Sequence, residues 1–174
     1  MLPAARNPAP RVELVSAARQ QEAVLANLLE LYIYDFSEFL PLELDAGGRF
    51  GYPPLPLYWS EPGRHPFLIY ADSKLAGLAL VTRGPEARHG NPAWDMAEFF
   101  IVRNSRRYGI GAVAAQQVWS RFPGLWTIRV RQANTKAVAF WQQAIDRFAG
   151  TPIEPAKALR DGGLWWVFTF QSAA

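Results

Sequence analysis

The spacing of apolar and polar positions along the chain predicts a mixed α/β fold. Six segments have the short apolar runs or alternation that are typical of strands. These strands are expected at residues 11–16, 66–71, 75–82, 94–102, 125–131 and 164–170. Apolar residues at helical spacing predict helices at residues 17–39, 109–120 and 134–148. Antiparallel strands first, followed by alternating strands and helices, indicate one mixed sheet with helices on its faces.

Residues 41–64 break this regular pattern with a series of prolines and glycines. A loop this long in a compact domain is usually functional or disordered. Its aromatic side chains, Tyr52, Tyr58 and Trp59, favour packing, and a substrate is one surface they could pack against. Four residues at the end of the first predicted helix either pack that helix end or line a pocket with the loop: Tyr32, Tyr34, Asp35 and Glu38.

Length and composition fit a single domain at residues 11–174 after a flexible tail at residues 1–10. The chain has 174 residues and no cysteine, which excludes disulfides, thiolate nucleophiles and Cys-ligated metals. No apolar run approaches the roughly 18 residues that a membrane span needs. We therefore expect a cytoplasmic protein without a membrane partner. The excess of arginine over lysine, together with abundant alanine, hints at a bacterial source.

The net charge of +3 is divided unevenly along the chain. Residues 99–145 hold seven basic residues and no acidic one, which leaves eleven basic and fifteen acidic residues elsewhere. Within this basic segment, Gly109 and Gly111 stand at the start of a predicted helix, just after Arg103, Arg106 and Arg107. Helix N-termini present unpaired N–H groups, and glycine lets a ligand approach the backbone closely. The segment thus predicts a phosphate or pyrophosphate site.

Two common phosphate-binding motifs do not explain this segment. A Walker loop needs a Gly-Lys pair, and the chain has none. Residues 109–114 match the permissive dinucleotide pattern G-x-G-x-x-G/A. That pattern also needs an acidic residue about 20 positions further on, but the next acidic residue is Asp146. Nicotinamide dinucleotide binding is therefore disfavoured.

A third pattern fits better. Residues 106–111, Arg-Arg-Tyr-Gly-Ile-Gly, match R/Q-x-x-G-x-G/A and follow the apolar strand that begins at Glu98. Residues 134–141, Asn-Thr-Lys-Ala-Val-Ala-Phe-Trp, match N-x-x-A-x-x-F-[YW]. With both motifs in this order, the chain resembles the GNAT superfamily of acyl-CoA-dependent N-acetyltransferases. The resemblance implies a mostly antiparallel sheet flanked by helices, with splayed central strands that bind acyl-CoA.

Carried over to this sequence, the resemblance implies a site for acetyl-CoA. The backbone of Phe99 and Ile101 would pair with the pantetheine amides, and Asn134 would contact the pantetheine arm. Backbone N–H groups of one loop would hold the pyrophosphate, and these belong to Arg106, Arg107, Tyr108, Gly109, Ile110 and Gly111. The acetyl group would pass to a primary amine of a small molecule or peptide by direct attack in a ternary complex.

The reaction needs a base, because an alkyl amine with a pKa near ~10.4 is mostly protonated at neutral pH. Glu98 occupies a strand position where family members often carry a glutamate, and Asp95 on the same strand is the alternative base. Glu98 could instead be a structural partner of an arginine. Many members have a tyrosine that protonates the leaving thiolate where this chain has Trp141, whose indole is no useful acid. No metal is expected, because His65 and His89 stand apart.

Two rival functions remain open at this point. Trp141 makes a non-catalytic acyl-CoA-binding module of the same fold the first alternative. A nucleic-acid-binding domain that uses the basic segment is the second, and it is disfavoured because the rest of the chain is acidic and no recognition motif occurs. The identity of the acceptor is not encoded in any motif, and a homodimer is left open.

Overall fold

The structure is a computed structural model that describes residues 9–84, 92–160 and 162–173. Most of the expected tail, His89 and most of the connection between the third and fourth strands lie outside these residues. The helices are α1 (Glu22–Phe36), α2 (Ile110–Arg121) and α3 (Thr135–Ala149), with short 3-10 turns at Arg19–Gln21, Leu55–Trp59 and Arg103–Ser105. The strands are β1 (Val12–Ser16), β2 (Arg64–Ala71), β3 (Lys74–Gly84), β4 (Ala93–Ile101), β5 (Gly124–Arg131), β6 (Ala156–Arg160) and β7 (Gly163–Ser172).

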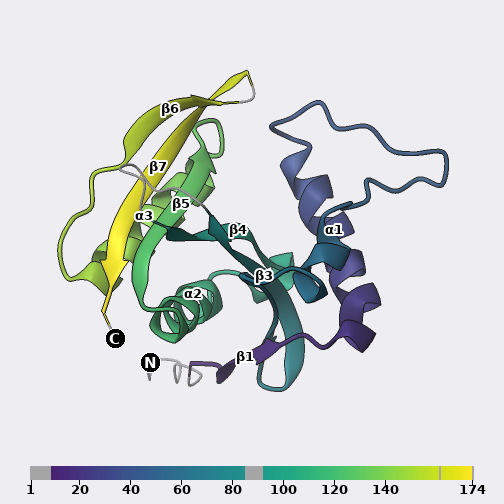
Figure 1. Cartoon of the computed structure of the whole chain (residues 1–174), viewed down its shortest axis with the longest axis horizontal. Coiled ribbons are helices and arrows are strands. Elements are labelled where there is room, and N and C mark those ends of the chain that lie inside the picture. Colours follow the sequence, from purple (N-terminus) through teal and green to yellow (C-terminus); the bar gives the residue numbers. More distant parts are fainter. Residues whose placement is uncertain (1–8, 85–91, 161, 174) are drawn as a thin grey trace, which may run out of the picture.

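These strands form one sheet in the order β1-β2-β3-β4-β5-β7-β6 (Figure 1). Every pair is antiparallel except β4 and β5, which run parallel. The expected mixed, mostly antiparallel sheet is therefore confirmed, as are the six strands and three helices predicted from the pattern. The first helix is shorter than expected at both ends, because Arg19–Gln21 form a 3-10 turn and α1 ends at Phe36, before the C-cap Ser37.

Strand β6 was not among the expected elements. It is five residues long and pairs only with β7, at the edge of the sheet. Its sequence, Ala-Lys-Ala-Leu-Arg, has none of the β-branched or aromatic residues that favour strands. These residues form a strand because they pair with β7, and their own sequence does not predict that pairing.

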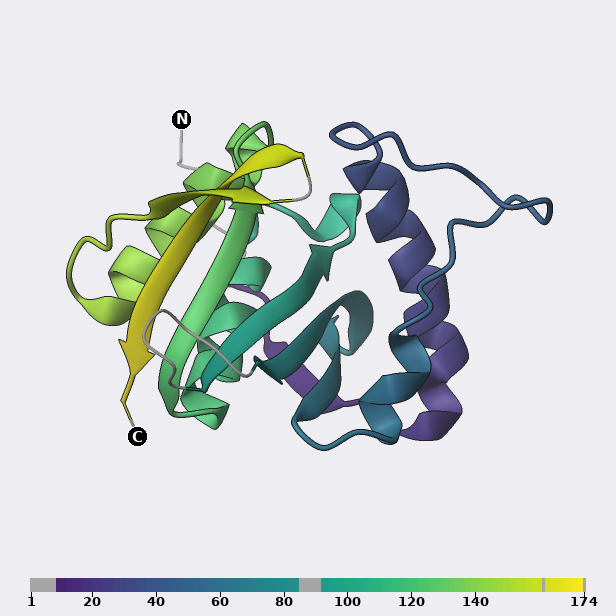
Figure 2. The same ribbon diagram turned by 45° about the horizontal axis from the view of Figure 1, so that its top comes forward.

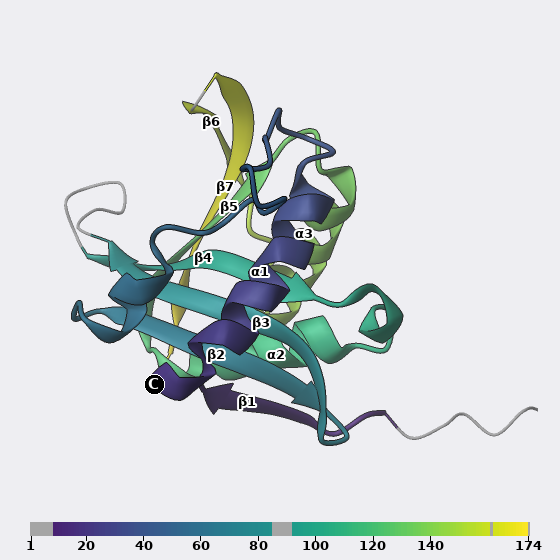
Figure 3. The ribbon, with the colours of Figure 1, turned by 90° about the vertical axis from the view of Figure 1, so that its right-hand side faces the viewer.

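Helix α1 covers one face of the sheet, and α2 and α3 cover the other (Figure 3). Under α1, Leu25, Leu28 and Leu29 pack in a cluster with Leu68, Leu78, Leu80 and Phe100 of the sheet. The larger cluster on the other face contains Trp119 of α2 and Ile145 of α3. No helix in the described ranges is long and apolar enough to cross a membrane.

The central parallel pair separates almost as soon as it forms. Strands β4 and β5 pair only at Trp94–Trp126 and Asp95–Thr127. Beyond that point the two ribbons diverge (Figure 2). This opening between the strands confirms the expected splay. A strand edge inside a domain leaves backbone groups that need partners, so the opening is suited to a ligand with amides of its own.

One glycine allows β3 and β4 to approach closely beside this opening. A Cβ on Gly77 would overlap the carbonyl of Phe100 and lie 3.1 Å from the Ile101 Cα. Neither of these atoms belongs to a flexible side chain, so the strands themselves would have to move. Gly84, on the same strand, has the Ala93 carbonyl at 3.9 Å from its built Cβ and offers ordinary space.

We predict that Gly77→Ala lowers the free energy of unfolding by about 1–3 kcal/mol, the usual cost of overpacking. Gly84→Ala is the matched control and should change stability by less than about 0.5 kcal/mol. Urea unfolding followed by tryptophan fluorescence measures both. Equal effects of the two substitutions would contradict the close approach at Gly77.

Candidate functional site

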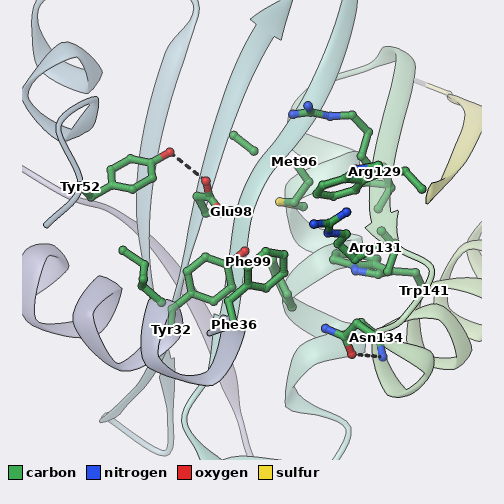
Figure 4. A pocket seen from close by; sticks show the side chains of 16 residues that line it. Tyr32, Phe36, Tyr52, Met96, Glu98, Phe99, Arg129, Arg131, Asn134 and Trp141 are labelled. Atoms are coloured by element: carbon green, nitrogen blue, oxygen red, sulfur yellow. Dashed lines mark hydrogen bonds between the residues drawn. The ribbon is translucent and has the colours of Figure 1, made fainter. Parts of the chain in front are cut away.

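A cavity of about 290 Å³ occupies the opening between β4 and β5. Its walls come from both strands, from α1, from the start of α3 and from Trp165 of β7 (Figure 4). Tyr52, from the long proline-rich loop, reaches into the same cavity. The polar side chains that line it include Glu98, Arg129, Arg131 and Asn134.

A bulge in β4 decides which side chains face the cavity. Leu80 of β3 pairs with Glu98, and the next residue, Val81, pairs with Met96, so Ala97 is an extra residue. In a regular strand, residues three apart such as Asp95 and Glu98 point to opposite faces. Because Ala97 is an extra residue, Glu98 points to the same face of the sheet as Asp95. This is the face that α1 covers.

Glu98 lies in this cavity under two tyrosines. The Tyr52 hydroxyl donates a hydrogen bond to Glu98 Oε1 at 2.9 Å (Figure 4). Burial raises the pKa of Glu98, while hydrogen bonds from Tyr32 and Tyr52 and the charge of Arg129 act in the opposite direction. Burial and the adjacent carboxylate raise the pKa values of Tyr32 and Tyr52 well above the ordinary value for tyrosine. Both hydroxyls therefore stay protonated and act as donors.

The loop that supplies Tyr52 is fixed to α1 by one carboxylate. Glu30 accepts hydrogen bonds from the backbone N–H groups of Phe50 at 2.8 Å and Gly51 at 2.9 Å. The Arg49 guanidinium lies 3.7 Å from the same carboxylate. The sequence singles out Tyr52 as a loop aromatic but gives no local signal for Glu30, whose partners are about twenty residues away.

Asp95 has a different environment from Glu98. Both of its oxygens accept hydrogen bonds from the Arg129 guanidinium, at 3.2 Å and 2.5 Å. Such a bidentate pair occupies lone pairs of the carboxylate that a base would use. The two carboxylates therefore differ in their partners: a guanidinium binds Asp95, whereas tyrosine hydroxyls donate to Glu98.

The expected anion loop lies between β4 and α2. Gly109 has φ +79° and Arg107 has φ +70°, so the backbone turns sharply before α2 begins at Ile110. The first N–H groups of a helix have no intrahelical acceptor and point outward. A Cβ on Gly111 would lie 3.2 Å from the ring of Phe140, so helix α3 requires the glycine there. Tyr108 is exposed.

Two of the three arginine side chains at this loop, those of Arg103 and Arg106, are paired with Asp35. Arg106 donates to the Ile101 carbonyl at 2.7 Å and to Asp35 at 2.6 Å, and its backbone N–H bonds the Arg103 carbonyl at 3.3 Å. Arg103 donates to the other oxygen of Asp35. Burial alone would raise the pKa of Asp35, but these hydrogen bonds lower it. The pair of arginines joins the loop to α1.

The remaining predicted residues lie along the opening. Phe99 lines the cavity, and Ile101 is buried at the end of β4. Asn134 caps α3, with its side-chain oxygen accepting the Ala137 N–H at 3.1 Å. Trp141 is buried and packs against Phe99, with ring centroids 5.1 Å apart, so it forms an apolar wall.

No cluster of three metal-ligating side chains occurs in the described part of the chain. His65 packs between aromatic rings, with Phe122 at 4.7 Å and Trp94 at 5.6 Å between centroids. Burial lowers the pKa of His65, which favours the neutral imidazole. Its role is in packing at the far end of the central strands.

Comparison with known proteins agrees with this geometry. The family model described as "Acetyltransferase (GNAT) family" matches residues 27–145. No protein with a curated functional description matches the sequence.

Three solved structures illustrate how widely the fold is shared. An acetyltransferase of Thermus thermophilus superposes with a TM-score of 0.66 at 15% identity, over 94% of this chain and 98% of that one. The YncA protein of Salmonella typhimurium, a putative acetyltransferase solved with its cofactor acetyl-CoA, gives 0.62 at 9% identity, over 93% and 94%. A point mutant of the SpeG spermidine N-acetyltransferase of Vibrio cholerae gives 0.57 at 11%, over 92% and 94%.

At these identities the superpositions establish the fold, and the family model covers more than half of the chain. The chain therefore belongs to the GNAT family of acetyltransferases.

Proposed function

We propose that this protein is an N-acetyltransferase that moves the acetyl group of acetyl-CoA to a primary amine by direct attack in a ternary complex. The observation that carries the proposal is the Glu98 carboxylate, held by Tyr52 at 2.9 Å in the opening where β4 and β5 separate. Relatives in the fold include a structure that contains acetyl-CoA and a spermidine N-acetyltransferase.

The residues along the opening fit the donor. N–H groups from Arg107 to Gly111 would hold the pyrophosphate, because the loop geometry and the start of α2 point donors outward there. The free edge of β4 at Phe99 and Ile101 would bond the pantetheine amides, and Asn134 would contact the pantetheine arm. The thioester supplies the acetyl group, and Trp141 shields this part of the cavity from water.

Glu98 is suited to accept the proton of the attacking amine. An amine with a pKa near ~10.4 is about 3.4 units from its neutral form at pH 7, which costs roughly 4.6 kcal/mol. A carboxylate whose pKa is raised by burial is a stronger base than one in water. The protonated amine gives one proton to Glu98, directly or through water, and becomes neutral. Its nitrogen then forms a bond to the thioester carbonyl carbon, the C–S bond breaks, and the second proton goes to the departing thiolate or to solvent.

The leaving thiolate does not depend on a tyrosine acid here. Trp141 cannot supply a proton, and Tyr32 and Tyr52 have raised pKa values that make them poor acids. With a thiol pKa near ~8.5, the free thiolate lies only about 2 kcal/mol above the protonated thiol in free energy at pH 7. The loss of that acid is therefore compatible with turnover.

The second candidate is a non-catalytic acyl-CoA-binding module, which Trp141 favours. Calorimetric titration with acetyl-CoA, followed by a thiol assay for CoA release with a panel of primary amines, separates the two. Amine-dependent CoA release supports the enzyme. Tight binding without release for any amine supports the module.

We predict that Gly109→Glu weakens CoA binding by roughly 100-fold or more, because like charges placed together cost several kcal/mol. Gly150→Glu is the matched control, since Gly150 ends α3 with φ +71° and, like Gly109, has no atom within 4 Å of its built Cβ. Both substitutions carry the same backbone strain. Calorimetry that shows equal CoA affinity for both variants would overturn the loop assignment.

We predict that Glu98→Gln lowers amine-dependent turnover by about 100-fold or more at pH 7, the usual range for a general base. The deficit should shrink at high pH, where the amine is already neutral. Glu154→Gln, at an exposed position between α3 and β6, should leave the profile unchanged. A loss of the same size at every pH would argue against Glu98 as the base.

We predict that Tyr52→Phe shifts the acidic limb of the pH–rate profile upward by about 1 unit, because the hydrogen bond stabilises the ionised carboxylate. Activity needs ionised Glu98, so it is lost as pH falls through the Glu98 pKa, and a higher pKa moves that loss to higher pH. Tyr34→Phe, on the exposed side of α1, is the control. An unshifted limb in Tyr52→Phe would disconnect Tyr52 from the base.

A further inference from the structure

Two arginines of β5 lie on the side of the sheet that α1 covers. Ile128 and Val130 are buried in the core under α2 and α3. Because side chains alternate along a strand, Arg129 and Arg131 project to the opposite side. Both line the cavity, and Glu98 faces the same side from β4 (Figure 4). The anion loop lies instead beyond the end of β4, at the start of α2.

Arg131 differs from Arg129 in how its charge is compensated. Arg129 is paired with both oxygens of Asp95. The Arg131 guanidinium lies 5.3 Å from the centre of the Trp165 ring, and its buried Nε has no hydrogen-bond partner among the described residues. Within residues 9–84, 92–160 and 162–173, no carboxylate comes within 4 Å of Arg131. Over those ranges, Arg131 is thus a cavity guanidinium without a counter-charge.

The surroundings of Arg131 hold the guanidinium in place. Trp165 is its cross-strand partner on β7. Gly163, two residues earlier on β7, lies directly under Nη1, where any side chain would collide with the guanidinium. A planar guanidinium over an indole presents its N–H donors in a fixed fork, which matches a bidentate acceptor. Carboxylate is the small planar anion that fits this edge.

We infer that the acceptor is an amine that also carries a carboxylate, which makes it an amino acid, and that Arg131 binds the carboxylate while Glu98 receives the amine proton. The inference rests on the proposed function and names its substrate class. Tyr32, Phe36 and Trp165 form aromatic walls of the cavity, so they favour an apolar side chain. In the reaction the N–C bond forms, the C–S bond breaks, one amine proton goes to Glu98, and the carboxylate is unchanged.

The test compares acceptors that differ only in the carboxylate. The standard L-amino acids and their carboxamides are assayed for acetyl-CoA-dependent CoA release with wild-type protein. At least one amino acid should exceed its amide in kcat/KM by about 10-fold or more, the range of a charge-assisted bidentate contact. Arg131→Gln should lower kcat/KM for that amino acid by roughly 10- to 100-fold and leave the amides unchanged.

Two further variants separate recognition from folding. Arg131→Lys keeps the charge but not the planar fork, so it should recover only part of the preference. Arg160→Gln removes an exposed charge of β6 and should behave as wild type. Thermal unfolding of each variant checks the fold, and calorimetry with the N-acetylated amino acid gives a readout that needs no turnover. That product should bind wild type more tightly than Arg131→Gln.

The outcomes are distinguishable. If CoA is released with amines but no amino acid is preferred over its carboxamide, this inference is overturned and the proposed function still stands. An equal loss for amino acids and amides in Arg131→Gln also overturns it, because that pattern marks a structural role. No release with any acceptor overturns the proposed function, and this inference with it.

Discussion

Strand β4 carries one residue more than β3 between Met96 and Glu98, and the geometry of the site follows from that insertion. The bulge turns Glu98 toward α1 while Met96 stays in the opposite core. Just before it, β4 loses its pairing with β5 after Asp95. A carboxylate and an open strand edge are thus brought together where the sheet separates. Bulges commonly have this effect, since they bend a strand and re-aim its side chains.

The opening can exist because its walls are supported from both sides. On one face, α1 packs on β2 to β4 through leucines, and Glu30 fixes the loop that carries Tyr52. On the other, Trp141 and Trp119 fill the space under β5, with ring centroids 6.1 Å apart. An enclosed cavity raises the pKa of Glu98, and the tyrosine hydroxyls limit that rise. The proposed base is thereby a stronger base than an exposed glutamate.

The ion pairs of the basic segment explain its role better than its net charge does. Asp35 holds Arg103 and Arg106, and Asp95 holds Arg129. These pairs join α1 to the anion loop and β4 to β5. Three of the arginines in the basic segment therefore hold the walls of the site together. Exposed ion pairs contribute little to stability, which makes their positioning role the more important one. Among the described residues, Arg131 has no carboxylate partner, and its guanidinium lies over the Trp165 ring.

The sequence by itself determined the order of the elements, the glycine loop before α2, and the family to which the chain belongs. Those features are local: helical spacing, glycines at 109 and 111, and the motif that begins at Asn134. The tertiary structure alone decided the partners of the two carboxylates, because Asp95 and Glu98 look alike until Arg129 is placed beside the first and Tyr52 beside the second. It also decided strand β6, the role of Glu30 and the stacking of Arg131 on Trp165, since each depends on partners from distant parts of the chain. Local patterns encode backbone geometry, whereas proton affinity and charge compensation arise only where strands and loops meet.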